Sequence, residues 1–149
     1  MKNQKPILIV DDQESDAEAL KRTLRKLGVE NPIFILPDGK DAICYLKGET
    51  PFQDREQHPF PAVMFLDLHM PEVNGWQVLD WLRGTSSQHE PWTFVYSDPR
   101  DVGEVRELYV RGADSFLRKP VTDVDLAALL HHFPKPWMIQ AGLLAGLDG

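Results

Sequence analysis

Residues 7–12 read ILIVDD and residues 62–67 read AVMFLD, so two apolar runs in this chain stop abruptly at an aspartate. A compact apolar run that ends at a polar residue is typical of a strand buried in a parallel sheet. Similar runs predict further strands at residues 33–36, 92–96 and 115–117.

The segments between these runs carry apolar residues at helical spacing. In the first of them, Ser15 and Glu18 predict a capping box, and Gly28 marks the end of the helix. One face of this helix is apolar and consists of Ala17, Leu20, Leu24 and Leu27. Further helices are expected around residues 42–46, 78–82, 102–109 and 126–133.

Five repeats of strand then helix predict an α/β fold with a parallel sheet covered on both faces. The commonest solution for five strands is the flavodoxin-like, doubly wound order 2-1-3-4-5 with five helices. Its ligand crevice lies at the carboxyl ends of the first and third strands. We therefore expect the functional residues at that end of the sheet.

Composition excludes several other classes of protein. The chain has 149 residues, enough for one domain, and a formal net charge of −7 with no basic stripe, which disfavours nucleic-acid binding. It shows no signal peptide and no apolar stretch long enough to span a bilayer, so a cytoplasmic protein is expected. Cys44 is the single cysteine, which excludes an internal disulfide.

Acidic residues gather where the fold places its crevice. Asp11 and Asp12 end the first strand, and Asp67 ends the third. Carboxylates that converge repel one another unless a cation joins them, and hard oxygen ligands favour Mg²⁺. The sequence therefore predicts a magnesium site, with no cofactor besides the ion.

A hydroxyl and an ammonium complete the predicted site. Ser97 follows the fourth strand, and Lys119-Pro120 follows the fifth. This set suits a phosphoryl group, with Asp67 as the acceptor and with Ser97 and Lys119 binding the phosphoryl oxygens. Taken singly, an Asp-Asp pair, a Lys-Pro pair or a serine at a strand end is more often an ordinary turn. The sheet order brings all of them together, which favours the functional interpretation.

The motifs ILIVDD, FLDLHMPEVNG and FLRKP, in this order, resemble the response-regulator receiver family of two-component signalling. The resemblance covers residues 5–133, and its most specific part is Asp67-x-x-Met70-Pro71 with Gly75 downstream. It implies a phosphoacceptor signalling protein, not an enzyme in the usual sense, whose self-phosphorylation and autophosphatase activity are weak. The loop at residues 48–61 resembles an insertion in the small receivers associated with phytochrome-type kinases.

The resemblance also implies a role for each site residue. Asp67 takes a phosphoryl group from a sensor histidine kinase or a phosphotransfer protein. Asp12, Asp67 and the backbone carbonyl of His69 hold Mg²⁺, and Asp11 helps through water. Lys119 binds the phosphoryl oxygens, and a cis peptide bond to Pro120 aims its ammonium inward. Ser97 and Phe116 act as the switch that follows the phosphoryl group.

Three positions depart from the family pattern. Phe116 stands where many members have tyrosine, so a switch there must act by packing alone. Asp98 follows Ser97, where the family has a small residue, and its charge disfavours an incoming phosphoryl dianion. Tyr96 is an alternative occupant of the position assigned to Ser97. Asp98 thus keeps a second function open, a pseudo-receiver that acts as a phosphorylation-independent interaction module.

Residues 134–149 form an apolar C-terminal tail outside the expected domain. The tail is either a packing extension or a docking or dimer segment, since aromatic and methionine side chains suit interfaces. We expect Trp137, Met138 and Ile139 to reach the face made by the fourth helix, fifth strand and fifth helix, where a homodimer or a downstream partner would bind. The identity of that partner is not predicted.

Overall fold

A computed structural model of the protein describes residues 4–85, 91–98 and 105–140. Five strands alternate with five helices in the described part of the chain, as the sequence predicts. The elements in chain order are β1 (Ile7–Val10), α1 (Glu14–Lys26), β2 (Ile33–Leu36), α2 (Gly39–Lys47), β3 (Val63–Leu66), α3 (Gly75–Arg83), β4 (Trp92–Ser97), α4 (Val105–Val110), β5 (Ser115–Arg118) and α5 (Asp123–His132).

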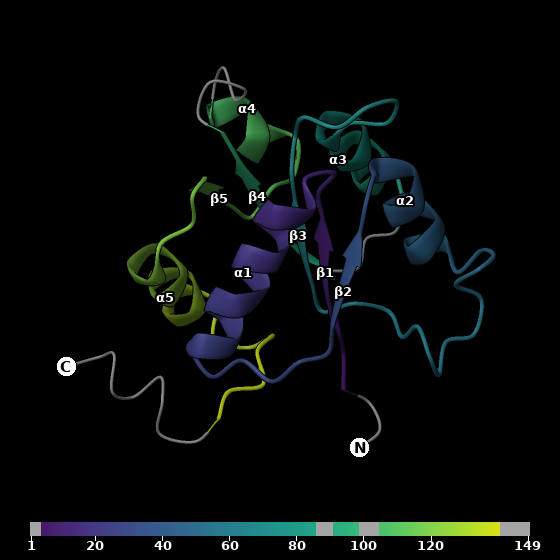
Figure 1. Cartoon of the computed structure of the whole chain (residues 1–149). Helices are drawn as coiled ribbons and strands as arrows, with labels where there is room; N and C mark the ends of the chain where they lie inside the picture. The colour runs from purple at the N-terminus through teal and green to yellow at the C-terminus, as the bar shows by residue number, and fades with distance from the viewer. Residues whose placement is uncertain (1–3, 86–90, 99–104, 141–149) are drawn as a thin grey trace.

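The strands form one parallel sheet in the order β2-β1-β3-β4-β5, which confirms the predicted flavodoxin-like arrangement (Figure 1). β1 and β3 pair in the centre, with Val10 opposite Leu66. Both strands are fully buried, so their apolar runs are continuous and do not alternate with polar residues. The register places Asp11 and Asp67, the residues that follow these partners, side by side at the carboxyl end of the sheet.

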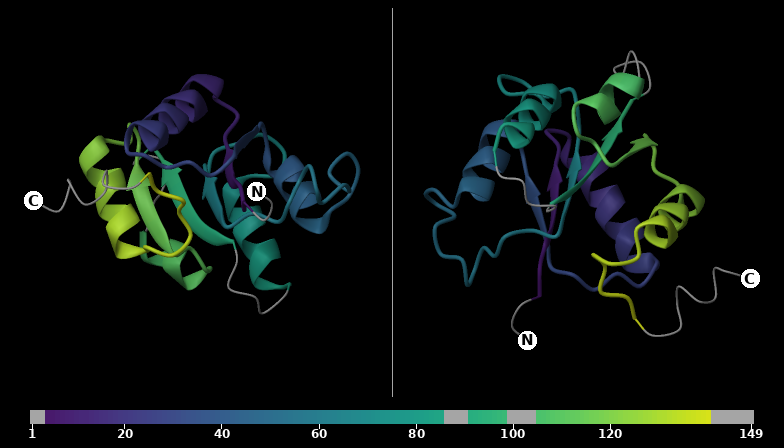
Figure 2. Two further views of the ribbon diagram at one scale, coloured as in Figure 1. Left: turned by 90° about the horizontal axis from the view of Figure 1, so that it is seen from below. Right: turned by 180° about the vertical axis from the view of Figure 1, so that it is seen from behind.

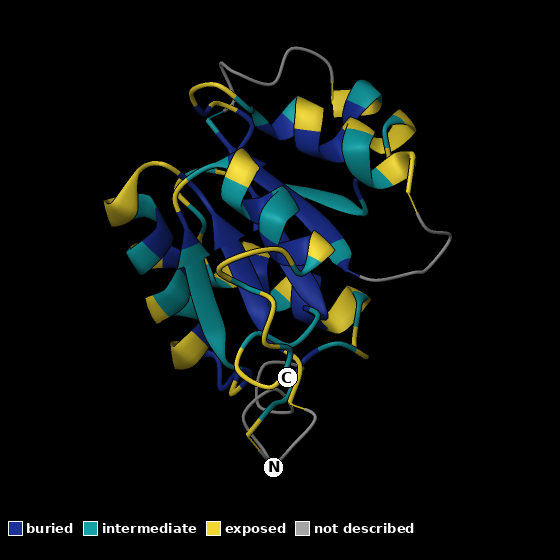
Figure 3. Ribbon diagram, turned by 90° about the vertical axis from the view of Figure 1, so that its right-hand side faces the viewer, coloured by how far each residue is buried: buried dark blue, intermediate teal, exposed yellow. Residues whose placement is uncertain are grey.

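Helices cover both faces of this sheet, and a separate apolar core lies on each side (Figure 2). Residues of α1 and α5, such as Leu24 and Leu130, pack on one face. Residues of α2, α3 and α4, such as Tyr45, Leu79 and Leu108, pack on the other. Figure 3 shows the buried residues concentrated in the strands and in the inward sides of the helices. None of the described helices is long and apolar enough to cross a membrane.

Two helices differ from the sequence prediction. α1 begins at Glu14, and Gln13 precedes it without a side-chain capping bond, so the capping box predicted from Ser15 and Glu18 is wrong. Asp11 instead accepts the backbone N–H of Gln13 at 2.9 Å, which turns the chain into the helix earlier. In α4 only Leu108 is buried, while Tyr109 is 48% exposed. Val102, expected in the same helix, lies outside the described residues.

The long connection between α2 and β3 packs through an aromatic cluster. Tyr45, Phe52 and His58 lie with ring centroids 5.0–5.8 Å apart, and the Tyr45 hydroxyl donates to the Pro59 carbonyl. Arg55 donates to the carbonyls of His58 and Leu46, which ties the segment back to α2. This loop is therefore held by its own contacts, away from the carboxyl end of β1 and β3.

The first residues of the tail return to the domain. Trp137 is buried, and its ring stacks on Phe94 and lies near Phe65. Met138 and Ile139 pair with the connection between α1 and β2, through Glu30 N–H to the Met138 carbonyl and a bridge from Ile139 to Val29. In Figure 1 this yellow segment lies at the end of the sheet opposite the strand arrowheads.

The expectation that these residues cover α4, β5 and α5 is therefore wrong. The physical reason is that the indole of Trp137 completes the apolar core between the sheet and α5, where it loses more contact with water than on an open face. Gln140 is the last described residue, and the remainder of the tail lies outside the described residues.

Trp137→Ala should lower the free energy of unfolding by about 3 kcal/mol, because it removes a large buried ring and leaves a cavity. Urea denaturation followed by circular dichroism measures this change. The matched control is Lys135→Ala, an exposed position in the same segment, which should change the stability by less than about 0.5 kcal/mol. Equal midpoints for both variants would show that Trp137 does not contribute to the core.

Candidate functional site at the carboxyl end of the sheet

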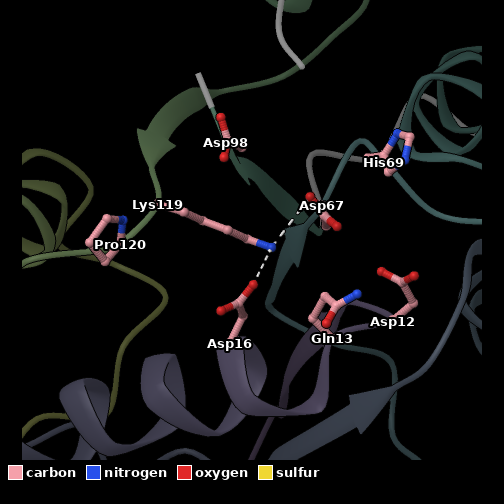
Figure 4. Close-up of a pocket in the computed structure, with 8 residues that line it drawn as sticks. All are labelled: Asp12, Gln13, Asp16, Asp67, His69, Asp98, Lys119 and Pro120. Atoms are coloured by element: carbon pink, nitrogen blue, oxygen red, sulfur yellow. Dashed lines mark hydrogen bonds and ion pairs between the residues drawn. The ribbon is translucent and has the colours of Figure 1, made fainter. Parts of the chain in front are cut away.

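A polar cavity of about 470 Å³ lies at the carboxyl end of the parallel strands. It is lined by Asp12, Gln13, Asp16, Asp67, His69, Asp98, Lys119 and Pro120 (Figure 4). The lining comes from the connections that follow β1, β3, β4 and β5 and from the first turn of α1. The crevice predicted from the sheet order is therefore present, and most of its lining is charged.

Three aspartates converge at this end of the sheet. Asp11, Asp12 and Asp67 each present a carboxylate oxygen, and these atoms lie within 4.8 Å of one another. Asp11 and Asp67 are buried, while Asp12 is exposed at the mouth. This all-oxygen donor set fits a hard divalent cation, which takes carboxylates together with water.

The close packing of α3 against β3 explains why Gly75 is needed near the site. A Cβ atom at Gly75 would meet the Asp67 carbonyl oxygen at 2.4 Å and the Leu68 Cα at 2.8 Å. The backbone N–H of Gly75 donates to the Leu68 carbonyl at 3.0 Å, and Asn74 caps the helix. The contact with the start of α3 thereby fixes the turn that carries Asp67 and His69.

Lys119 reaches into the cavity from the connection between β5 and α5, and its ammonium lies among carboxylates (Figure 4). The peptide bond from Lys119 to Pro120 is cis, as the resemblance implies. Nζ lies 2.9 Å from Asp11 Oδ2 and 3.5 Å from Asp67 Oδ1. The side chain is only 15% exposed, so these charges interact with little screening by solvent.

Ser97 ends β4 and donates its hydroxyl to Asp67 Oδ1 at 3.0 Å. The structure thus places the Ser97 hydroxyl, and not that of Tyr96, beside the Asp67 carboxylate. Phe116 is half-buried and packs against the core on the α4 side of the sheet. Asp98 lines the same cavity and is half-buried.

Burial and charge act in opposite directions on Asp67. Desolvation raises its pKa to about 6, helped by the charge of Asp11 and opposed by Lys119, by the Ser97 hydroxyl and by a backbone hydrogen bond from His69. For Lys119, burial lowers the pKa, but the hydrogen bond and charge of Asp11 and the charge of Asp67 outweigh it, so the pKa lies above its ordinary value. The ammonium therefore stays charged at neutral pH. Ionising Asp67 at that pH lowers the stability of the folded protein.

Sequence reasoning did not predict the contacts that Tyr96 and Asp16 make in the site. The Tyr96 hydroxyl donates to Asp11 Oδ2 at 2.6 Å, although Tyr96 points into the core on the α1 side. Asp16, in the first turn of α1, lies 3.1 Å from the Lys119 ammonium. The only signal for Asp16 was its place one turn after the Asp11-Asp12 pair. Nothing in the sequence indicated the reach of Tyr96.

Comparison with known proteins agrees with this geometry. The family model of the response regulator receiver domain matches residues 7–131. The chain therefore belongs to the response regulator receiver family of two-component signalling.

Several relatives cover almost the whole chain. The bacteriophytochrome response regulator RtBRR superposes with a TM-score of 0.80 at 27% identity, covering 97% of this chain and 95% of RtBRR. The probable methanogenesis regulatory protein FilR2 of Methanothrix harundinacea is 26% identical, over 89% of this chain and 83% of FilR2. Response regulator Rcp1 of Synechocystis sp. is 23% identical over 90% of this chain and 89% of Rcp1, and a solved structure shows its Mn²⁺-bound form. The chain is thus similar to the small, phytochrome-associated receivers.

Asp67→Asn should stabilise the metal-free protein at pH 7. The folded-state pKa of Asp67 lies above its ordinary value of 3.8, so this carboxyl favours folding at low pH and loses that contribution as the pH rises through about 6. The variant should therefore gain about 1–3 kcal/mol over wild type in EDTA above about pH 6.5, and less near pH 4.5.

Urea denaturation across this pH range measures the difference. Glu56→Gln, at an exposed loop carboxylate outside the cavity, serves as the control and should show no such trend. A less stable Asp67→Asn variant at pH 7 would contradict the electrostatic account of the site.

Proposed function

We propose that this protein is a response regulator whose Asp67 accepts a phosphoryl group from the phosphohistidine of a sensor histidine kinase or phosphotransfer protein. The observation that carries the proposal is the placement of Asp67. Its carboxylate lies at the base of the cavity, between the Ser97 hydroxyl at 3.0 Å and the Lys119 ammonium at 3.5 Å. Among the carboxylates that line the described cavity, only that of Asp67 contacts both the Ser97 hydroxyl and the Lys119 ammonium.

In the proposed transfer, an Asp67 carboxylate oxygen attacks the phosphorus of the phosphohistidine. The P–N bond breaks, the imidazole keeps the electron pair, and an acyl phosphate forms on Asp67. Lys119 and Ser97 then donate to the phosphoryl oxygens and offset their charge. Hydrolysis reverses the modification: water attacks phosphorus, the O–P bond to Asp67 breaks, and inorganic phosphate leaves. The weak self-phosphorylation and autophosphatase activity expected from the resemblance belong to this same chemistry.

A Mg²⁺ ion is the proposed cofactor. Asp12, Asp67 and the backbone carbonyl of His69 would hold it directly, and Asp11 would act through water. The convergence of three carboxylate oxygens within 4.8 Å supports this assignment. The Mn²⁺-bound form of Rcp1 shows that this relative binds a divalent cation. When bound, the ion neutralises negative charge on the carboxylates and the phosphoryl oxygens.

Output is proposed to pass through protein contacts of the domain at residues 5–133. Ser97 contacts the acceptor, and Phe116 packs one strand away in β5, so both can respond to a phosphoryl group on Asp67. The face of α4 carries exposed apolar side chains, including Tyr109 and Val110, that suit a downstream partner or a second copy of the chain. Within the tail at residues 134–149, Trp137 is buried in the core and would not contribute to such a contact.

The pseudo-receiver alternative rests on Asp98 alone. Its charge beside the cavity opposes an incoming dianion, on the order of 1 kcal/mol in a partly screened site, which slows transfer several-fold without abolishing it. The convergence of Asp12, Asp67 and Lys119 in one cavity, with the Ser97 hydroxyl bonded to Asp67, favours the phosphorylated regulator.

Acetyl phosphate with Mg²⁺, followed by intact-mass spectrometry, tests this function directly. Wild type should gain one phosphoryl group, and Asp67→Asn should gain none, because only Asp67 combines both donors with the acidic cluster. Asp54→Asn, at an exposed loop carboxylate, is the matched control and should label like wild type. An unlabelled wild type would favour the pseudo-receiver, and equal labelling of Asp67→Asn would place the acceptor elsewhere.

A further inference from the structure

The Lys119 ammonium lies nearer to two other carboxylates than to the proposed acceptor. Its Nζ is 2.9 Å from Asp11 Oδ2 and 3.1 Å from Asp16 Oδ2, but 3.5 Å from Asp67 Oδ1. Figure 4 shows the ammonium between Asp16 and Asp67. In this state Lys119 is therefore shared among carboxylates, and Asp67 has the longest of the three contacts.

The contact with Asp11 is fixed by the surrounding protein. Asp11 Oδ2 also accepts the Tyr96 hydroxyl at 2.6 Å, and Oδ1 accepts the Gln13 N–H at 2.9 Å. Tyr96 and Asp11 are 1% and 2% exposed, so water cannot readily replace these bonds. The ammonium also lies 4.8 Å from the centre of the Tyr96 ring, a cation–π distance. Asp11 is thus held in place by these bonds, and Lys119 can keep its ion pair with Asp11 while its other contacts change.

The contact with Asp16 is of a different kind. Its side chain is 46% exposed and comes from the first turn of α1, at the rim of the cavity. An ion pair in such a position is weak and exchanges readily for water or another anion. Asp16 can therefore hold Lys119 in the resting site and release it when a stronger anion arrives.

We propose that Asp16 restrains phosphorylation of Asp67 by competing with the phosphoryl group for Lys119. The Lys119 ammonium keeps its ion pair with Asp11. It gives up the Asp16 carboxylate and binds a phosphoryl oxygen in its place. This inference rests on the proposed function, and the transfer itself follows the same bond changes, with no further reactant. Asp16 is a positioning residue, because it acts on the reaction only through Lys119.

Asp16→Asn tests the competition with little change in shape. Removing the competing charge should raise the initial rate of labelling by acetyl phosphate and Mg²⁺ about two- to fivefold, the range expected for a partly exposed ion pair. Glu14→Gln is the matched control: it removes the same charge from the same turn of α1, but Glu14 does not line the cavity. This control should label at nearly the wild-type rate.

A double-variant cycle separates competition from simple charge repulsion. In a Lys119→Met background, Asp16→Asn should no longer raise the labelling rate, because the ammonium for which Asp16 competes is gone. If that background labels too slowly to follow, the comparison of Asp16→Asn with Glu14→Gln decides alone. Thermal melts of every variant confirm that each one is folded under the assay conditions.

The outcomes distinguish this inference from the function on which it rests. A wild type that labels at the same rate as Asp16→Asn would overturn the role of Asp16 and leave the acceptor assignment intact. Asp16→Asn could also raise the labelling rate in the Lys119→Met background, or Glu14→Gln could raise it equally. Either result would show that negative charge repels the phosphodonor in general and that Asp16 does not compete for Lys119. A wild type that does not label would overturn both proposals.

Discussion

The excess of carboxylate over ammonium at one end of the sheet is the constraint on which the rest of this structure depends. In the part of the chain that the structure describes, Asp11 and Asp67 are buried beside one ammonium, that of Lys119, and Asp12 adds a third negative charge within reach. Burying ionised groups is costly unless hydrogen bonds and opposite charges compensate. The raised pKa of Asp67 shows that the compensation is incomplete, so the site favours an additional cation or a proton.

The fold supplies the rigidity that such a cluster requires. Each charged residue follows a strand of the sheet or, as with Asp16, lies in the first turn of a helix packed on the sheet. Parallel pairing of β1 with β3 sets Asp11 beside Asp67, and the absence of a side chain at Gly75 lets α3 lie against the turn below them. The buried carboxylates of Asp11 and Asp67 are therefore held close together, and a bound cation would relieve their repulsion.

Sequence reasoning predicted the strands and their order because apolar runs that end at polar residues, alternating with helical segments, are typical of a parallel sheet. Asp11, Asp67, Ser97 and Lys119 followed from the same argument, since each comes at or directly after a strand end. The bond from Tyr96 to Asp11 could not be predicted, because it depends on how far one side chain reaches across the sheet. The location of Trp137 was mistaken because an apolar segment after a helix can fold inward or remain on the surface, and the spacing of its residues does not distinguish the two.

Binding of Mg²⁺ to the metal-free protein tests most directly whether a cation joins these carboxylates. Isothermal titration of EDTA-treated wild type should show one ion per chain, and Asp12→Asn should weaken binding about tenfold or more, because it removes an anionic ligand. The variant must retain the wild-type thermal melt for the comparison to apply. Unchanged affinity in a folded Asp12→Asn variant, or no binding to wild type, would contradict the account of this site.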